Sequence, residues 1–188
     1  MGDRIPEELI EAAWTARRES FALPEDERQA VLASVRRDLE RAVDLLAAAD
    51  RDVDRAHALH LLAHVESGMG ASARAGALWL EAVGLLRAAG DPQELAHKVR
   101  HLGDFEWGRG RWRVADGHYR EALELYRAHG AGSELEWANT LQRCARSAEK
   151  LGSAAGARAL WAEARDRYEA IGLEEGVREA ERRIAALG

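Results

Sequence analysis

The chain has 188 residues, of which 47% are hydrophobic and 32% charged. The hydrophobic share is enough to form a core, which argues against a largely disordered chain. The net charge of −6 argues against a nucleic-acid partner, because such proteins usually carry a basic face. Cys144 is the only cysteine, which excludes an intramolecular disulfide and disfavours a Cys-based zinc site.

Apolar residues recur at spacings of three and four along most of the chain, which predicts helices rather than strands. Pro6, Pro24 and Pro92 are each followed by acidic or amide residues, and both features favour the first turn of a helix. Ser133 with Glu136 forms a capping-box pattern at another start. About nine helices are predicted, over residues 7–21, 25–49, 53–68, 71–89, 92–109, 111–129, 134–151, 154–171 and 174–187.

An internal repeat is the most specific feature of the sequence. Residues 81–86 (EAVGLL) align with residues 121–126 (EALELY) at an offset of 40. Residues 41–46 align with residues 81–86 at the same offset. An offset of 42 then takes Tyr119 to Trp161. Glycines repeat with the same offsets after the second helix of each copy: Gly90, Gly130 and Gly172. A single hairpin cannot bury its apolar face, so the copies are expected to stack into a solenoid.

One solenoid domain is therefore expected over residues 1–188. It starts with a degenerate N-terminal hairpin, residues 7–49. Three repeats follow, at residues 53–89, 92–129 and 134–171, and residues 174–187 form a C-terminal capping helix. Val177, Ala180, Ile184 and Leu187 give this last helix the apolar stripe that a cap needs.

The repeats resemble the tetratricopeptide repeat (TPR), in the long variant of 40 to 42 residues found in bacterial proteins. The best copy matches the family's pattern of a bulky apolar residue, Leu-Gly, Gly, aromatic, Ala, aromatic and Ala at Val99, Leu102, Gly103, Gly110, Trp112, Ala115, Tyr119 and Ala122. The resemblance implies an all-α, right-handed solenoid of antiparallel hairpins. It also implies a protein-binding scaffold that is not an enzyme and needs no cofactor.

In this family the first helix of each hairpin lines a concave groove. Carried over position by position, the resemblance predicts a partner-binding groove at His57, His60, His64, His97, Arg100, Asp104, Trp107, Asn139, Gln142, Arg146, Glu149 and Lys150. These residues share helix faces, since positions three, four and seven apart lie on one side of a helix. A solvated polar face without a ligand is the alternative interpretation.

The histidines leave a second hypothesis open. His60 and His64 are four residues apart, a spacing that permits a shared metal ion, and His97 or Asp104 would complete such a site. A metal-binding protein or a metal-dependent hydrolase is therefore an alternative function. The histidines also predict ligand binding that depends on pH near 6 to 7, the range in which imidazole ordinarily titrates.

The expected partner is a protein or peptide, held by an adaptor or regulatory scaffold, with no role for nucleic acid or membrane. No apolar run is long enough for a membrane span and the N-terminus lacks the pattern of a signal peptide, so a cytoplasmic location is expected. A self-associating homo-oligomer is a further alternative. Cys144 is expected in the core, where a thiol is inert.

Overall fold

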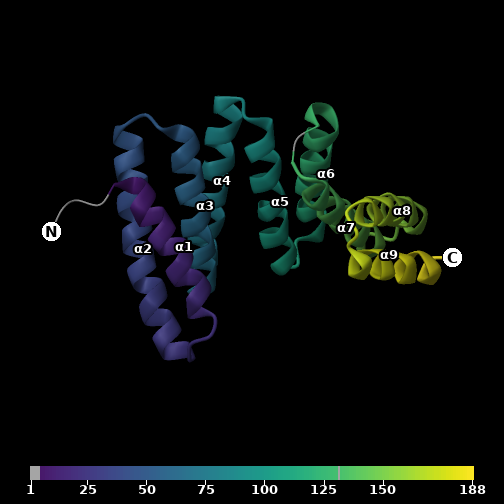
Figure 1. Ribbon diagram of the computed structural model, residues 1–188, viewed down its shortest axis with the longest axis horizontal. Helices are drawn as coiled ribbons and strands as arrows, with labels where there is room; N and C mark the ends of the chain where they lie inside the picture. Colours follow the sequence, from purple (N-terminus) through teal and green to yellow (C-terminus); the bar gives the residue numbers. More distant parts are fainter. Residues whose placement is uncertain (1–4, 131) are drawn as a thin grey trace. The chain divides into compact units, whose positions relative to one another are not determined.

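The computed structural model describes residues 5–130 and 132–188, which contain nine α-helices and no strand (Figure 1). Every predicted helix is present, and each boundary lies within one residue of the prediction. The helices are α1 (Pro6–Ser20), α2 (Glu25–Ala48), α3 (Asp52–Gly68), α4 (Ser72–Ala89), α5 (Pro92–Gly108), α6 (Trp112–His129), α7 (Glu134–Lys150), α8 (Ala154–Ala170) and α9 (Glu174–Ala186).

Two helices begin with the predicted side-chain caps. The Asp91 carboxylate accepts a hydrogen bond of 3.0 Å from the Glu94 N–H at the start of α5. At α7 the Ser133 hydroxyl accepts from the Glu136 N–H at 3.2 Å, while the Glu136 carboxylate accepts from the Ser133 N–H at 2.9 Å. These contacts satisfy backbone donors that have no partner inside the helix.

The even-numbered helices α2, α4, α6 and α8 are followed by a residue in the left-handed backbone region. Gly90, Gly130 and Gly172 have φ angles of 70°, 58° and 69°. Asp50 occupies the same repeat position in the degenerate first hairpin, with a φ of 52°. Glycine adopts this conformation without steric cost, whereas an aspartate tolerates it less well. The repeat therefore extends into the first hairpin at the level of the backbone.

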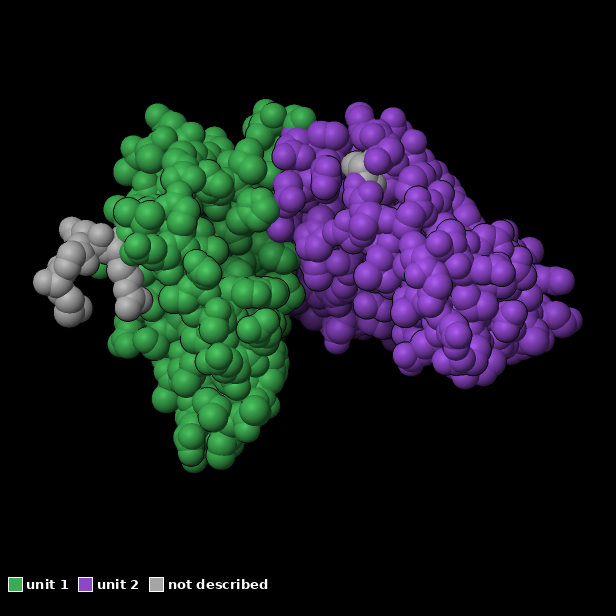
Figure 2. Space-filling model, viewed as in Figure 1, with its two compact units in different colours: residues 1–90 green, residues 91–188 purple. Residues whose placement is uncertain are grey.

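The chain forms two compact units, residues 1–90 and 91–188 (Figure 2). In unit 1, α1 packs on α2, α2 on α3, and α3 on α4. Leu32, Val35 and Leu39 of α2 form the centre of a core cluster with Ala13 of α1 and Leu62 of α3. The degenerate first hairpin is thus packed through an ordinary apolar interface.

In unit 2, α5 packs on α6, α6 on α7, α7 on α8, and α8 on α9. The main core cluster is built from small and aromatic residues, including Ala138, Ala157 and Trp161. Small side chains let paired helices approach closely while one ring fills the space between them. The predicted apolar stripe of α9 is confirmed: Ala180 is buried, and Val177, Ile184 and Leu187 pack against this cluster.

The predicted core position of Cys144 is confirmed, because its thiol is buried and burial raises its pKa to about 12. Trp14 of α1 lies outside the core. This side chain is 49% exposed, because Leu9 and Ala13 supply the buried positions of α1.

Candidate functional site

Asp104 lies at the centre of a polar network between α5, α6 and α7. Its Oδ1 accepts hydrogen bonds from the Tyr119 hydroxyl at 2.9 Å and from the Nε of Arg143 at 2.7 Å. Its Oδ2 accepts from the Nη1 of Arg100 at 3.2 Å. Burial is the largest cause that raises the pKa of Tyr119, and the Asp104 charge adds to it, so this hydroxyl remains a donor.

A cavity of about 370 Å³ opens beside this network, between α5 and α7. We call it the α5–α7 cavity. It is lined by Asp104, Trp107, Tyr119, Arg143 and Arg146, all of which belong to unit 2. Of these, Asp104, Trp107 and Arg146 are predicted groove residues.

A second cavity of about 400 Å³, the α7–α9 cavity, lies further along α7. Asn139, Gln142 and Arg146 line it from α7, and Arg146 therefore belongs to both cavities. The opposite wall is formed by α9 and the residues just before it: Leu173, Glu175, Gly176, Glu179 and Arg182. This last helix was expected only to cap the fold, but its polar face also contributes a wall of the cavity.

Tyrosines of the second helices form part of both cavities, which the sequence did not predict. Tyr119 lines the α5–α7 cavity and Tyr168 lines the α7–α9 cavity. The Tyr168 hydroxyl donates to the Asn139 side-chain oxygen at 2.9 Å, which leaves the Asn139 amide N–H groups as donors. Both tyrosines fit the apolar spacing of their helices, so no signal in the sequence distinguished their hydroxyl ends.

Other predicted groove residues make contacts elsewhere in unit 2. Glu149 accepts from the indole N–H of Trp161 and from Arg183. The Lys150 ammonium lies 4.0 Å from the centre of the Trp112 ring, a cation–π contact. Glu149 and Lys150 were predicted to belong to the groove, but they line neither of the two cavities.

His97 is joined to the start of α7. Its Nδ1 lies 2.8 Å from a carboxylate oxygen of Glu136. Burial lowers the pKa of His97, and the positive charges of Lys98 and Arg100 lower it further, against the opposing effect of Glu136. We infer that the neutral imidazole predominates at neutral pH.

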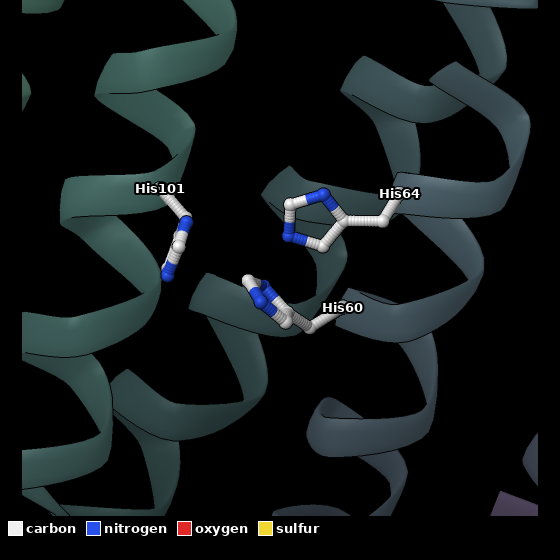
Figure 3. Close-up of side chains that lie close together, drawn as sticks. All are labelled: His60, His64 and His101. Atoms are coloured by element: carbon white, nitrogen blue, oxygen red, sulfur yellow. The ribbon is translucent and has the colours of Figure 1, made fainter. Parts of the chain in front are cut away.

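The predicted histidines of unit 1 lie on α3. His60 and His64 are one turn apart, with ring centroids 4.7 Å apart in an edge-to-face arrangement (Figure 3). His60 is buried, and its Nδ1 accepts a hydrogen bond of 3.2 Å from the indole N–H of Trp79. The third side chain in that figure, His101, belongs to α5 in unit 2, and its ring centroid lies 4.6 Å from that of His97.

These contacts bear on the metal hypothesis. An indole N–H only donates, so the Nδ1 of neutral His60 is unprotonated and its Nε2 carries the proton. A metal ion would therefore have to displace Trp79 or change the tautomer of His60. Asp104 and His97, the further ligands considered, are both hydrogen-bonded within unit 2. Metal analysis of the purified protein tests this hypothesis directly.

Comparison with known proteins identifies the fold. No family model matches the sequence, and no curated protein matches it either. Among solved structures, RapI in its apo form is similar with a TM-score of 0.79 and 12% identity, over 96% of this chain and 62% of RapI. Aspartyl phosphate phosphatase F from Bacillus subtilis has a TM-score of 0.72 and 13% identity, over 100% of this chain and 50% of that protein.

A third similar structure is a Signal Transduction ATPase with Numerous Domains from Pyrococcus horikoshii, which carries a tetratricopeptide repeat sensor. Its TM-score is 0.73 at 17% identity, and the match covers 95% of this chain but only 27% of that protein. The chain is an all-α solenoid of the tetratricopeptide type, as the resemblance implied. Among the described residues, no helix is both long and apolar enough to cross a membrane.

Proposed function

We propose that the chain is a protein-interaction module, an adaptor or regulatory scaffold that holds a peptide segment against α5, α7 and α9. The observation that carries this proposal is the pair of cavities along these helices, both of which Arg146 lines. Such concave sites, with a few placed polar groups and an aromatic wall, are typical of ligand-binding surfaces.

The chemistry of the cavities fits a polypeptide ligand. Asn139 and Gln142 offer side-chain amides, which pair with the N–H and C=O groups of an extended backbone. Trp107 offers an aromatic surface in the neighbouring cavity, and tryptophan and arginine are the residues most often found at interaction hot spots. The role proposed for α3, through His57, His60 and His64, rests on the resemblance alone.

The buried thiol of Cys144 also favours binding over nucleophilic catalysis. A thiol with a pKa of about 12 carries almost no thiolate at neutral pH, and the thiolate is the reactive form. We propose a non-enzymatic role for the chain on this basis together with the character of the cavities.

Site-specific crosslinking in the native host tests the proposal. A photoreactive residue replaces Gln142 in the α7–α9 cavity, and the matched control replaces Arg158, which is exposed on α8. We expect a protein to be captured at position 142 and not at position 158. Equal capture at both positions would contradict the groove assignment.

Affinity for the captured partner provides the quantitative test. Replacing Trp107 and Arg146 together by alanine should weaken binding by about 2 kcal/mol or more, as expected when hot-spot contacts are lost. Titration calorimetry measures the change, with Arg158→Ala as the control. Unchanged affinity in the double variant would reject these residues as contacts.

A further inference from the structure

Arg146, which both cavities share, has unused hydrogen-bonding capacity. Its buried Nε donates to no acceptor among the described residues. Its Nη2 lies 3.6 Å from a carboxylate oxygen of Glu179, beyond hydrogen-bonding distance. Glu179 instead accepts from Arg182 at 2.6 Å and from Arg183 at 3.0 Å. Glu179 therefore shares its charge among three arginines, and it forms no hydrogen bond with Arg146.

The α5–α7 cavity has an excess of positive charge. Among the described residues that line it, Asp104 is the only carboxylate; Arg100 and Arg143 pair with it, and the Tyr119 hydroxyl also donates to it. The contact with Asp104 uses the Nε of Arg143, and a guanidinium has further N–H donors on its two terminal nitrogens. The described lining has Arg143 and Arg146 against Asp104, a formal charge of +1, although the whole chain has a net charge of −6.

The same cavity has an aromatic wall. Trp107 supplies this wall and is half-buried, whereas the Tyr119 ring that also lines the cavity is almost fully buried. An acidic side chain combines a short apolar stem with a planar carboxylate. Aromatic rings suit the stem, and guanidinium groups bind a carboxylate through paired charge-assisted hydrogen bonds.

We propose that the α5–α7 cavity is a subsite for the side-chain carboxylate of an aspartate or glutamate in an extended segment of the partner. This proposal rests on the proposed function and specifies the partner's chemistry. Because Arg146 also lines the α7–α9 cavity, a bound segment has room to continue beyond the carboxylate. A side chain within the segment therefore fits this geometry better than a terminal carboxylate, at which the chain ends.

Nuclear magnetic resonance tests the subsite without a known partner. The probe is glutamate blocked at both ends, N-acetyl-glutamate N-methylamide, whose only charge is the side-chain carboxylate. The uncharged control is N-acetyl-glutamine N-methylamide, and N-acetyl-alanine supplies a terminal carboxylate instead. The Nε–H resonances of Arg143 and Arg146 and the indole N–H of Trp107 report on binding.

We expect the blocked glutamate to shift these resonances saturably and the blocked glutamine to leave them unchanged. Arg146→Gln should weaken the binding of the blocked glutamate about tenfold, the effect of losing a charge-assisted hydrogen bond. The matched control Arg158→Gln, on the exposed face of α8, should bind like the wild type. A chemical-shift comparison confirms that both variants are folded.

Three results would overturn the subsite. These are equal shifts with blocked glutamine, equal weakening by Arg158→Gln, and binding of N-acetyl-alanine alone, which would assign a terminal carboxylate. The results of this test and of the crosslinking test distinguish the subsite from the proposed function. Glutamate binding without a captured partner contradicts the interaction module, whereas a captured partner without glutamate binding contradicts only the subsite.

Discussion

Gly103 allows α5 to lie close to the ring of Tyr119. A Cβ atom built at Gly103 would lie 2.6 Å from Cε1 and 2.7 Å from Cδ1 of Tyr119, closer than atoms can approach. The Tyr119 ring is 1% exposed, and its hydroxyl donates to Asp104, so the ring cannot move without losing that bond. The glycine therefore fixes the position of a group that lines the α5–α7 cavity.

The other two repeats differ at this position in a consistent way. Ala63 and Ala145 occupy the position equivalent to Gly103, and tryptophans replace Tyr119, namely Trp79 and Trp161. Each indole N–H donates to a residue other than the one equivalent to Asp104. The two repeats with alanine at this position are thus the two in which the aromatic side chain does not bond the residue equivalent to Asp104.

We predict that Gly103→Ala destabilises the protein by about 1–3 kcal/mol, the usual cost of overpacking a core. The matched control is Gly117→Ala on α6, where a Cβ would meet no atom within 4 Å. Alanine should stabilise that exposed helix position, by up to about 1 kcal/mol. Urea unfolding measures both changes. A stabilising effect of Gly103→Ala would contradict the close packing of Tyr119.

His97 should make stability depend on pH. Burial first, and then the charge of Lys98, holds its pKa below the ordinary value. The unfolded state therefore binds the proton more readily, so stability rises with pH through this range. The contribution is complete above the unfolded value of about 6.5 and is lost as pH falls toward the folded pKa. We predict that His97→Gln reduces this dependence.

Unfolding free energies measured between about pH 8 and about pH 5 check this prediction, since imidazole titrates in that interval. The control is His129→Gln, which removes an exposed imidazole at the end of α6. An unchanged profile in His97→Gln would show that the Glu136 contact balances the effect of burial. Titration of the His97 ring by NMR would then place its pKa at or above the ordinary value.

At the scale of the helices, the capping box of α7 offers a sharp comparison. Ser133 caps α7 through its side chain, whereas Ser153 precedes α8 without a side-chain cap. We predict that Ser133→Ala lowers the unfolding free energy by about 0.5–2 kcal/mol, the range for lost N-caps. Ser153→Ala should change it much less. Equal effects of the two substitutions would mean that the Ser133 contacts contribute no stability.

The helices were predictable because their apolar spacing is regular and many of their starts and ends have a local cause. Caps, prolines and left-handed glycines act within a few residues, and the repeat supplies several copies of each signal. The offset of 42 that aligns Tyr119 with Trp161 also aligns the sequence of α6 with that of α8. The degenerate first hairpin was predicted for similar reasons, since its apolar spacing is intact.

The candidate site was only partly predictable. Helix periodicity alone predicts that Asp104 and Arg146 lie on the first-helix faces, and both line the α5–α7 cavity. Glu149 and Lys150 instead reach Trp161 and Trp112, contacts that depend on side-chain rotamers and on neighbouring helices. The Tyr119 hydroxyl was missed because a buried ring and a ring with a polar end give the same apolar pattern.

At the scale of the whole molecule, the sequence repeat continues from unit 1 into unit 2. Its offset of 40 aligns Trp79 of unit 1 with Tyr119 of unit 2. We predict that the chain unfolds as one domain, because neighbouring repeats in a solenoid stabilise each other. Gly103→Ala in unit 2 should then lower hydrogen-exchange protection in α3 as much as in α7. A reciprocal variant in unit 1, Leu39→Ala, removes a fully buried side chain and should lower protection in α7 as well.

Mass spectrometry of exchanged peptides separates one domain from two. The most protected amides of a cooperative domain exchange only through global unfolding, so a destabilising change anywhere reduces their protection equally. If the units unfold independently, Gly103→Ala will leave α3 unchanged and Leu39→Ala will leave α7 unchanged. The two variants together thus decide whether α3 and α7 belong to one cooperative structure, independently of any ligand.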